Sequence, residues 1–197
     1  IFSCAKKGRP SWGPKDITPP VMLKSIPDNY SINFTGQEIE IYFNEYVKLK
    51  DLTKQLIISP PLNITPLISP QGGASKSIKI KIFDTLKSNT TYSFNFGKSI
   101  VDNNEGNPFS FFKYVFSTGQ NIDSLKFTGS IRDAISKTAD DFVSVMLYEI
   151  DSTFTDSIVY NKAPRYITNT LDSTTNFKFE NLKSGKYLLT ALKEETD

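Results

Sequence analysis

The chain has 197 residues, and its 23 Lys and Arg residues nearly balance its 21 Asp and Glu residues. This length accommodates one large domain or two small ones, and the balanced charge excludes the strongly basic surface typical of nucleic-acid-binding proteins. The sequence contains no His, which excludes Ser-His-Asp and Cys-His nucleophile systems and imidazole ligation of zinc. Its 15 Phe and 9 Tyr residues, together with many Thr, Ser and Ile residues, favour β-strands over helices.

The N-terminal segment carries the single cysteine of the sequence, Cys4, directly after Ile1-Phe2-Ser3. An apolar residue, a loose position and a small residue before a cysteine resemble the end of a bacterial lipoprotein signal, and this resemblance implies diacylglycerol on the thiol. The alternative is a small buried cysteine in a first strand. Because residues 5–19 are rich in Gly, Pro and Lys, we expect residues 1–19 to be the end of a lipoprotein signal and a short disordered tether.

Short apolar runs separated by turn residues fill residues 20–119. Residues 38–43 alternate polar and apolar side chains, and residues 77–82 do the same with lysines on one face, which is typical of half-buried strands. Further strands are expected at 21–23, 56–59, 91–96 and 111–118. About seven strands in roughly 100 residues predict an immunoglobulin-like β-sandwich.

Several blocks in this region resemble a known family, and they occur in the family's order. They are Thr-Pro-Pro-Val at 18–21, Ile-Glu-Ile-Tyr-Phe-Asn-Glu-Tyr-Val at 39–47, Glu-Gly-Asn at 105–107 and Phe-Ser-Thr-Gly at 116–119. The blocks look like the bacterial Ig-like family of S-layer (SbsA) type, and the whole layout is similar to Ig-like lipoproteins of the Bacteroidota. The resemblance implies a structural or binding role and supplies no catalytic residue.

The remaining sequence predicts a second β-rich unit over residues 126–197, after a junction at 120–125. Strands are expected at 127–131, 143–148, 166–168, 176–180 and 185–191. Their motifs resemble the prealbumin-like β-sandwich of carboxypeptidase regulatory and Cna-B-type repeats. Because the sequence stops soon after a predicted core strand, we expect the protein to continue beyond Asp197. The expected fold class is all-β, with two tandem β-sandwich domains.

Two groups of acidic residues are candidate chemical sites. Glu38, Glu40 and Glu45 are candidates for a glycoside-hydrolysing carboxylate pair, but surface charge is the simpler interpretation because Glu45 falls on the opposite side of an unbroken strand. The oxygen-rich segment 102–107 is a weak calcium candidate through Asp102, Asn104 and Glu105. It lacks the ligand spacing of an EF-hand and suits a tight turn, so we expect no metal site.

Five Asp-Ser or Asp-Thr pairs followed by Thr or an aliphatic residue resemble the O-glycosylation motif of extracytoplasmic Bacteroidota proteins. Composition alone predicts about one such match. The alternative is that these pairs serve as turn and cap residues. The candidate glycosylation sites are Thr85, Ser124, Ser152, Ser157 and Ser173.

Aromatic residues are concentrated between positions 109 and 116. In a sandwich strand, Phe112, Tyr114 and Phe116 share one face and are expected to point into the core. Phe109 and Phe111 are then expected to face outward, where they are the candidate contact for a partner.

Together these features predict a non-enzymatic, lipid-anchored envelope protein that acts as an accessory or scaffold subunit and binds another envelope protein. The alternative is a cell-surface glycan-binding or adhesion module, and a glycanase is a distant third. No cofactor and no nucleic acid are expected. Ala5 after the cysteine favours the outer membrane by family analogy. Lys6 and Lys7 differ from the acidic residues typical of surface-exported lipoproteins, so the periplasmic and cell-surface faces both stay open.

Overall fold

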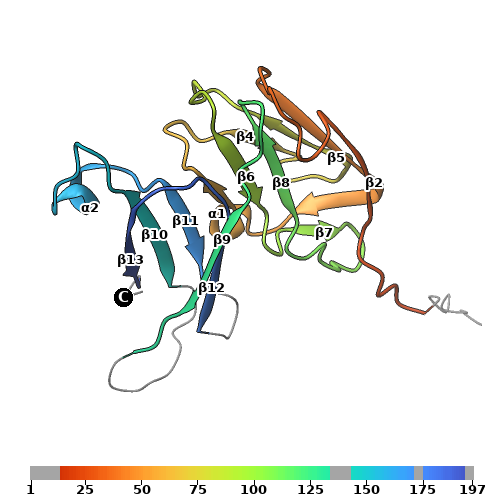
Figure 1. Ribbon diagram of the computed structural model, residues 1–197. Helices are drawn as coiled ribbons and strands as arrows, with labels where there is room; N and C mark the ends of the chain where they lie inside the picture. The colour runs from red at the N-terminus through yellow and green to blue at the C-terminus, as the bar shows by residue number, and fades with distance from the viewer. Residues whose placement is uncertain (1–13, 134–142, 171–174, 194–197) are drawn as a thin grey trace, which may run out of the picture.

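The computed structural model describes residues 14–133, 143–170 and 175–193, so Cys4, Ser173 and most of the predicted tether lie outside the described residues. Among the described residues, the regular secondary structure is mostly β-strand, with two short helices (Figure 1). The strands are β1 (Met22–Ile26), β2 (Glu38–Leu49), β3 (Ile57–Ser59), β4 (Leu67–Ser69), β5 (Ser75–Lys81), β6 (Thr91–Asn95), β7 (Ile100–Asp102), β8 (Lys113–Ser117), β9 (Leu125–Ser130), β10 (Ser144–Glu149), β11 (Tyr166–Asn169), β12 (Asn176–Leu182) and β13 (Tyr187–Leu192). The short helices are α1 (Leu52–Gln55) and α2 (Ile158–Asn161).

The first sheet is organised around the long strand β2. Its first half pairs with β1 on one side and β5 on the other, and its second half pairs with β7. β4 lies beyond β5. The alternation expected from the sequence is confirmed, because Ile39, Ile41, Ile78 and Ile80 are fully buried while the residues between them face solvent or are partly covered.

A second sheet, in the order β3-β6-β8, closes the sandwich over the first. Phe112, Tyr114 and Phe116 are buried in the shared core, as expected. Val115, on the other face of β8, is also completely buried. The outer face of this sheet is therefore covered as well, in part by β11 and β12, which contact β3 and β6.

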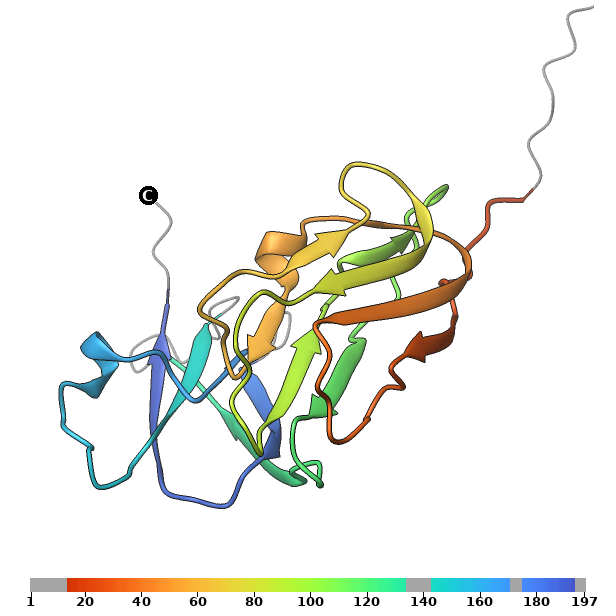
Figure 2. The same cartoon turned by 90° about the horizontal axis from the view of Figure 1, so that it is seen from above.

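The C-terminal part consists of the pair β9-β12 and the sheet β11-β10-β13. Its core is separate from that of the N-terminal part and is formed by Val145, Leu147, Tyr166, Phe177, Phe179 and Leu182. Gly129 on β9 lets the Phe177 ring approach closely, since an added Cβ would lie 2.5 Å from the ring. The two parts lie side by side (Figures 1 and 2).

Polar contacts join the two parts. Lys113 on β8 forms an ion pair with Glu180 on β12, with 2.6 Å between Nζ and Oε2. The Asn181 side-chain amide donates to the Asp123 carbonyl at 3.0 Å, and the Ile167 amide donates to Ser59 Oγ at 3.3 Å. The two parts are thus docked through β3 and β8 on one side and β11 and β12 on the other.

The orientation predicted for Phe109 is wrong. Its ring is half-buried and packs edge-on against Phe43 and beside Phe112 in the core. The reason is local: β8 begins only at Lys113, and Phe111 has a φ of 60°, which breaks the strand alternation on which the prediction rested. Phe111 alone of the pair faces outward and is 56% exposed.

No helix in the described residues has the length and hydrophobicity needed to cross a membrane.

Candidate functional site

A cleft of about 540 Å³ lies at the junction of the two parts, and we call it the junction cleft. The N-terminal part contributes the loop around Tyr30, helix α1, strands β3 and β6, and the segment before β8. The C-terminal part contributes the end of β11 and the outer side of β12. The cleft exists because the two parts are docked side by side.

Two exposed aromatic residues line the junction cleft, Tyr30 and Phe111, each 56% exposed. Both have left-handed backbone conformations, with φ values of 64° and 60°, which bulky residues rarely adopt. Hydrogen bonds hold these conformations: the Tyr30 amide donates to the Val115 carbonyl at 2.7 Å, and the Phe111 amide donates to the Gly97 carbonyl at 2.6 Å. Hydrogen bonds therefore hold the backbone that carries both rings in a fixed conformation.

The lining of the junction cleft also includes polar side chains. Gln55 Oε1 accepts a hydrogen bond from the Lys98 amide, and Asn95 Oδ1 accepts one from the Gly97 amide. Each carboxamide oxygen is thus used to order the loop after β6, which leaves the NH₂ group of each side chain as a donor. Gly97 is required here, because its φ is +55° and an added Cβ would lie 2.5 Å from Gln55 Oε1.

The described residues that line the junction cleft include more lysines than carboxylates. Lys54, Lys98, Lys113 and Lys178 line it, and Glu180 is the one carboxylate among its described lining residues. Partial burial alone would raise the pKa of Glu180, but ion pairs with Lys113 and Lys178 outweigh this and lower the pKa to about 2. Lys126 approaches the same carboxylate at 3.7 Å. Glu180 is therefore ionised at neutral pH and cannot act as a proton donor, so the cleft suits binding better than acid–base catalysis.

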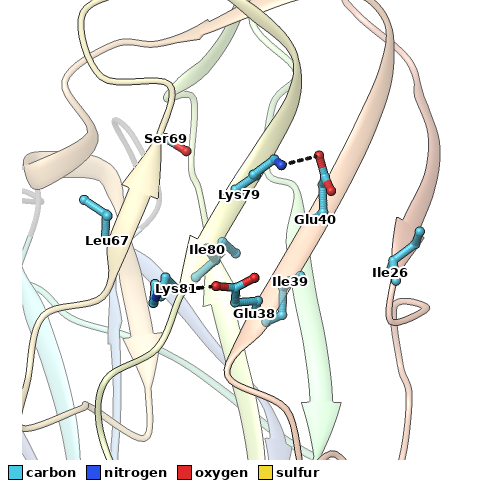
Figure 3. A pocket seen from close by; sticks show the side chains of 9 residues that line it. All are labelled: Ile26, Glu38, Ile39, Glu40, Leu67, Ser69, Lys79, Ile80 and Lys81. Atoms are coloured by element: carbon cyan, nitrogen blue, oxygen red, sulfur yellow. Dashed lines mark ion pairs between the residues drawn. The ribbon is translucent and has the colours of Figure 1, made fainter.

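A second hollow, of about 320 Å³, lies on the outer face of β2, β5 and β4 (Figure 3). Here Glu38 pairs with Lys81 at 3.5 Å and Glu40 pairs with Lys79 at 3.3 Å, each pair directly across the strands. Partial desolvation works against ionisation of Glu40, but hydrogen bonds from Tyr42, Ser77 and Lys79 lower its pKa overall. A general acid needs a raised pKa, so Glu40 does not fit the role of the general acid in glycoside hydrolysis.

Glu45 lies away from these two glutamates. It is half-buried, and burial together with the nearby charges of Asp102, Asp16 and Glu105 raises its pKa. The structure therefore does not assemble the three glutamates of the hydrolase hypothesis into one site.

The segment 102–107 is a turn ordered by the Asp102 carboxylate. Its Oδ1 accepts hydrogen bonds from the amides of Asn104, Glu105 and Gly106, and its Oδ2 accepts one from Asn107. In the part of the chain that is described, no group of three acidic, cysteine or histidine side chains is placed to hold a metal ion. Asp102 thus orders the turn at residues 102–107 through hydrogen bonds to its carboxylate.

Four of the candidate glycosylation sites are described, and all are exposed and outside strands: Thr85, Ser124, Ser152 and Ser157. Asp151, next to Ser152, accepts hydrogen bonds from the amide and hydroxyl of Thr153, which is typical of a turn. Both interpretations of the Asp-Ser and Asp-Thr pairs stay open, because exposed turns serve each equally well.

Sequence reasoning identified Phe111 but missed Tyr30, the amide residues and Glu180. A usable signal for Tyr30 was its position directly after the turn residues Asp28 and Asn29, where no strand alternation buries an aromatic side chain. No comparable signal exists for Glu180, because its lysine partner at 113 is distant in the sequence.

The family model described as bacterial Ig-like domain matches residues 16–118, just over half of the 197 residues. This range spans β1 to β8 and so the whole N-terminal sandwich. Comparison with curated proteins gives no match.

Proposed function

Because the chain belongs to the bacterial Ig-like domain family, we propose that it is a non-catalytic envelope protein that serves as an accessory or scaffold subunit. In this role it holds an extended segment of another envelope protein against the open edge of β13. The observation that carries the proposal is the contrast between this edge and the protected edges of the N-terminal sandwich.

The edges of the N-terminal sandwich are blocked against strand addition. β1 is short and has a register shift between Met22 and Lys24, and β4 has three residues between Pro66 and Pro70. Bulges, lysines and prolines are the usual protection of edge strands. The edge of β8 is covered by the segment before β2, since the Tyr30 amide bonds to Val115 and the Phe34 amide bonds to Ser117.

Strand β13 has none of these protections. It pairs in unbroken register with β10, has no other strand partner within the described residues, and contains neither a charged residue nor a proline. The Ile150 amide bonds to the Lys186 carbonyl, so by antiparallel alternation the amides of Leu189 and Ala191 point to the open side. Leu189 is 43% exposed and Leu192 is 55% exposed.

These features favour an extended polypeptide with apolar side chains as the proposed partner. Its backbone would complete the unpaired amides and carbonyls of β13, and its side chains would cover Leu189 and Leu192. The backbone hydrogen bonds of such a complex would accept many partner sequences, whereas its side-chain contacts would select among them. Both properties suit a scaffold subunit.

The test removes one outward donor from β13. Ala191→Pro deletes the outward amide, whereas Ala191→Val keeps it and serves as the matched control. We expect a partner that copurifies from membranes with the native protein and with Ala191→Val to be lost with Ala191→Pro, while the melting temperature of the proline variant stays within a few degrees of the control. Retention of the same partner by Ala191→Pro would contradict strand addition at β13.

The proposal places the protein at the outer membrane through a lipid on Cys4. The support is the sequence Ile1-Phe2-Ser3-Cys4 and the Gly- and Pro-rich segment that follows. Intact-mass analysis of the protein from membranes should show a mass increase from acyl chains, and Cys4→Ala should lose it together with membrane association. The same spectrum would register hexose-sized increments if the exposed Asp-Ser and Asp-Thr sites carry glycans. An unmodified Cys4 would rule out the anchor.

A further inference from the structure

We propose that the junction cleft binds a proline-rich segment of another polypeptide in the polyproline II conformation. This goes beyond the strand addition proposed for β13 and uses none of the same residues. Two properties of the cleft carry the inference. Its two exposed aromatic rings are held in place beside β8, and the carboxamide groups that line it have their oxygen atoms in use and their NH₂ groups to spare.

Both aromatic rings of the cleft are held to the same strand. Phe111 lies two residues before β8, and the Tyr30 amide donates to the Val115 carbonyl within β8. Both residues keep a left-handed backbone, which costs bulky residues energy and persists where the surrounding structure enforces it, commonly at ligand sites. Exposed aromatic rings that line a groove are the surfaces on which proline rings of a polyproline II helix dock.

The carboxamide oxygens of the cleft already accept hydrogen bonds within the protein. This holds for all four carboxamide side chains among the described lining residues: Asn29, Gln55, Asn95 and Asn169. Asn29 also uses its NH₂ group, which donates to the Lys113 carbonyl at 3.0 Å. Within the part of the chain that is described, the NH₂ groups of Gln55, Asn95 and Asn169 have no acceptor. The cleft therefore offers a ligand three carboxamide donors.

A wall of donors matches the backbone of proline, which has a carbonyl acceptor and no N–H group. A polyproline II helix has no internal hydrogen bonds, so its carbonyls are free to accept from the wall. A saccharide would also bring hydroxyl donors that need acceptors. Glu180, the one carboxylate among the described lining residues, is already engaged by Lys113 and Lys178. The lining therefore favours a proline-rich segment over a saccharide.

The test titrates the whole protein by calorimetry with a capped oligoproline peptide. The matched probes are a capped Gly-Ser peptide of the same length, which is also uncharged but keeps its N–H donors and its flexibility, and a neutral oligogalactoside. We expect oligoproline to bind about tenfold more tightly than either probe, because its conformation is formed before it binds. Since oligoproline carries no charge, its affinity should change little with added salt.

The first variants remove each ring and keep the backbone. Asn accepts the left-handed conformation, so Tyr30→Asn and Phe111→Asn should keep the fold and weaken oligoproline binding by about fivefold to tenfold each. The matched control is Tyr160→Asn, at an 87% exposed tyrosine on α2 that does not line the cleft. This control should bind oligoproline as the native protein does.

A further variant removes one donor and keeps the loop that its side chain orders. Gln55→Glu retains an oxygen to accept from the loop after β6 and replaces the NH₂ group with a second oxygen, which cannot donate. Oligoproline binding should therefore weaken by about threefold to tenfold. Gln71→Glu makes the same change at an exposed bend outside the cleft and should leave binding unchanged.

Equal binding of the Gly-Ser peptide and oligoproline would overturn the proposal. Tighter binding of the oligogalactoside would also overturn it and would assign the cleft to a saccharide. Absence of oligoproline binding, or binding that the two asparagine variants and Gln55→Glu leave unchanged, would contradict it as well. Because these variants leave β13 unchanged, partner capture through Ala191 succeeds or fails independently.

Discussion

At the scale of single residues, Asp102 has the largest structural role of the candidate site residues. Its side chain is 2% exposed, yet four backbone amides donate to its carboxylate. Burial alone would raise its pKa, but these hydrogen bonds outweigh burial and lower the pKa below its ordinary value of 3.8. The charged form is therefore part of the folded turn.

Asp102→Asn should destabilise the protein by about 1–3 kcal/mol at neutral pH, because several amides lose a charged acceptor. Since the folded pKa is lowered, the stabilisation is present above the ordinary pKa and disappears as pH falls through the folded value. Urea unfolding at several pH values should show the native protein and the variant converging in acid. The exposed neighbour Glu105→Gln is the control; an equal loss there would contradict the role of Asp102.

Residue-scale prediction from sequence worked where strand alternation applied. Phe112, Tyr114 and Phe116 were placed correctly because they lie in or next to β8, which has regular period-two geometry. Phe109 was misplaced because Phe111 takes a left-handed turn just before that strand. Composition does not reveal such a turn, since Phe is among the residues least expected at positive φ.

At the scale of elements, Glu180 on β12 and Lys113 on β8 form a charged contact between the two parts. Lys113 and Lys178 each lie 2.6 Å from the carboxylate, whose side chain is 22% exposed. Burial alone would raise the pKa of Glu180, but these ion pairs outweigh burial and hold the pKa at about 2, below its ordinary value of 4.5.

Glu180→Gln should cost about 1–2 kcal/mol at neutral pH, because it leaves three lysines close together without their counter-charge. With a lowered folded pKa, the stabilisation is complete above about 4.5 and is lost as pH falls toward about 2. Hydrogen exchange at β3 and β11 should speed up in the variant at pH 7. Glu38→Gln, which breaks an exposed pair, should change stability by less than about 0.5 kcal/mol; an equal effect would contradict a special role for Glu180.

Elements with clear periodicity were predictable from sequence, but two of the three-residue strands were not. β2 and β5 were expected because polar and apolar residues alternate along them, and their lysines and glutamates pair across the outer face. β4 and β7 were missed because each has three residues bordered by turn-forming residues. Such strands are held by their neighbours in the sheet and carry almost no local signal.

At the scale of the whole molecule, the junction cleft was beyond sequence prediction. Ser59, Asp123 and Glu180 make the contacts that dock the two parts, and they are far apart along the chain. Each looks like an ordinary surface residue until the two cores are placed side by side. The family match covers the N-terminal sandwich and so does not reach the C-terminal wall of the cleft.

The separation of the two cores predicts that the N-terminal part folds without the C-terminal part. All members of the first core lie between Phe34 and Phe116, and its strands pair among themselves within residues 22–117. A polypeptide of residues 14–123 keeps the bond from the Asp123 amide to Thr91 Oγ1 and loses the Lys113–Glu180 pair. We expect one cooperative thermal transition, several degrees below that of the whole chain because a contact of about 1–2 kcal/mol is lost.

Near-ultraviolet circular dichroism is the appropriate readout, because Tyr92, Phe94, Tyr114 and Phe116 pack against one another in this core. The shorter polypeptide should keep their signal. Loss of the aromatic signal would mean that the outer face of β8, with Val115 at its centre, needs its C-terminal cover to fold.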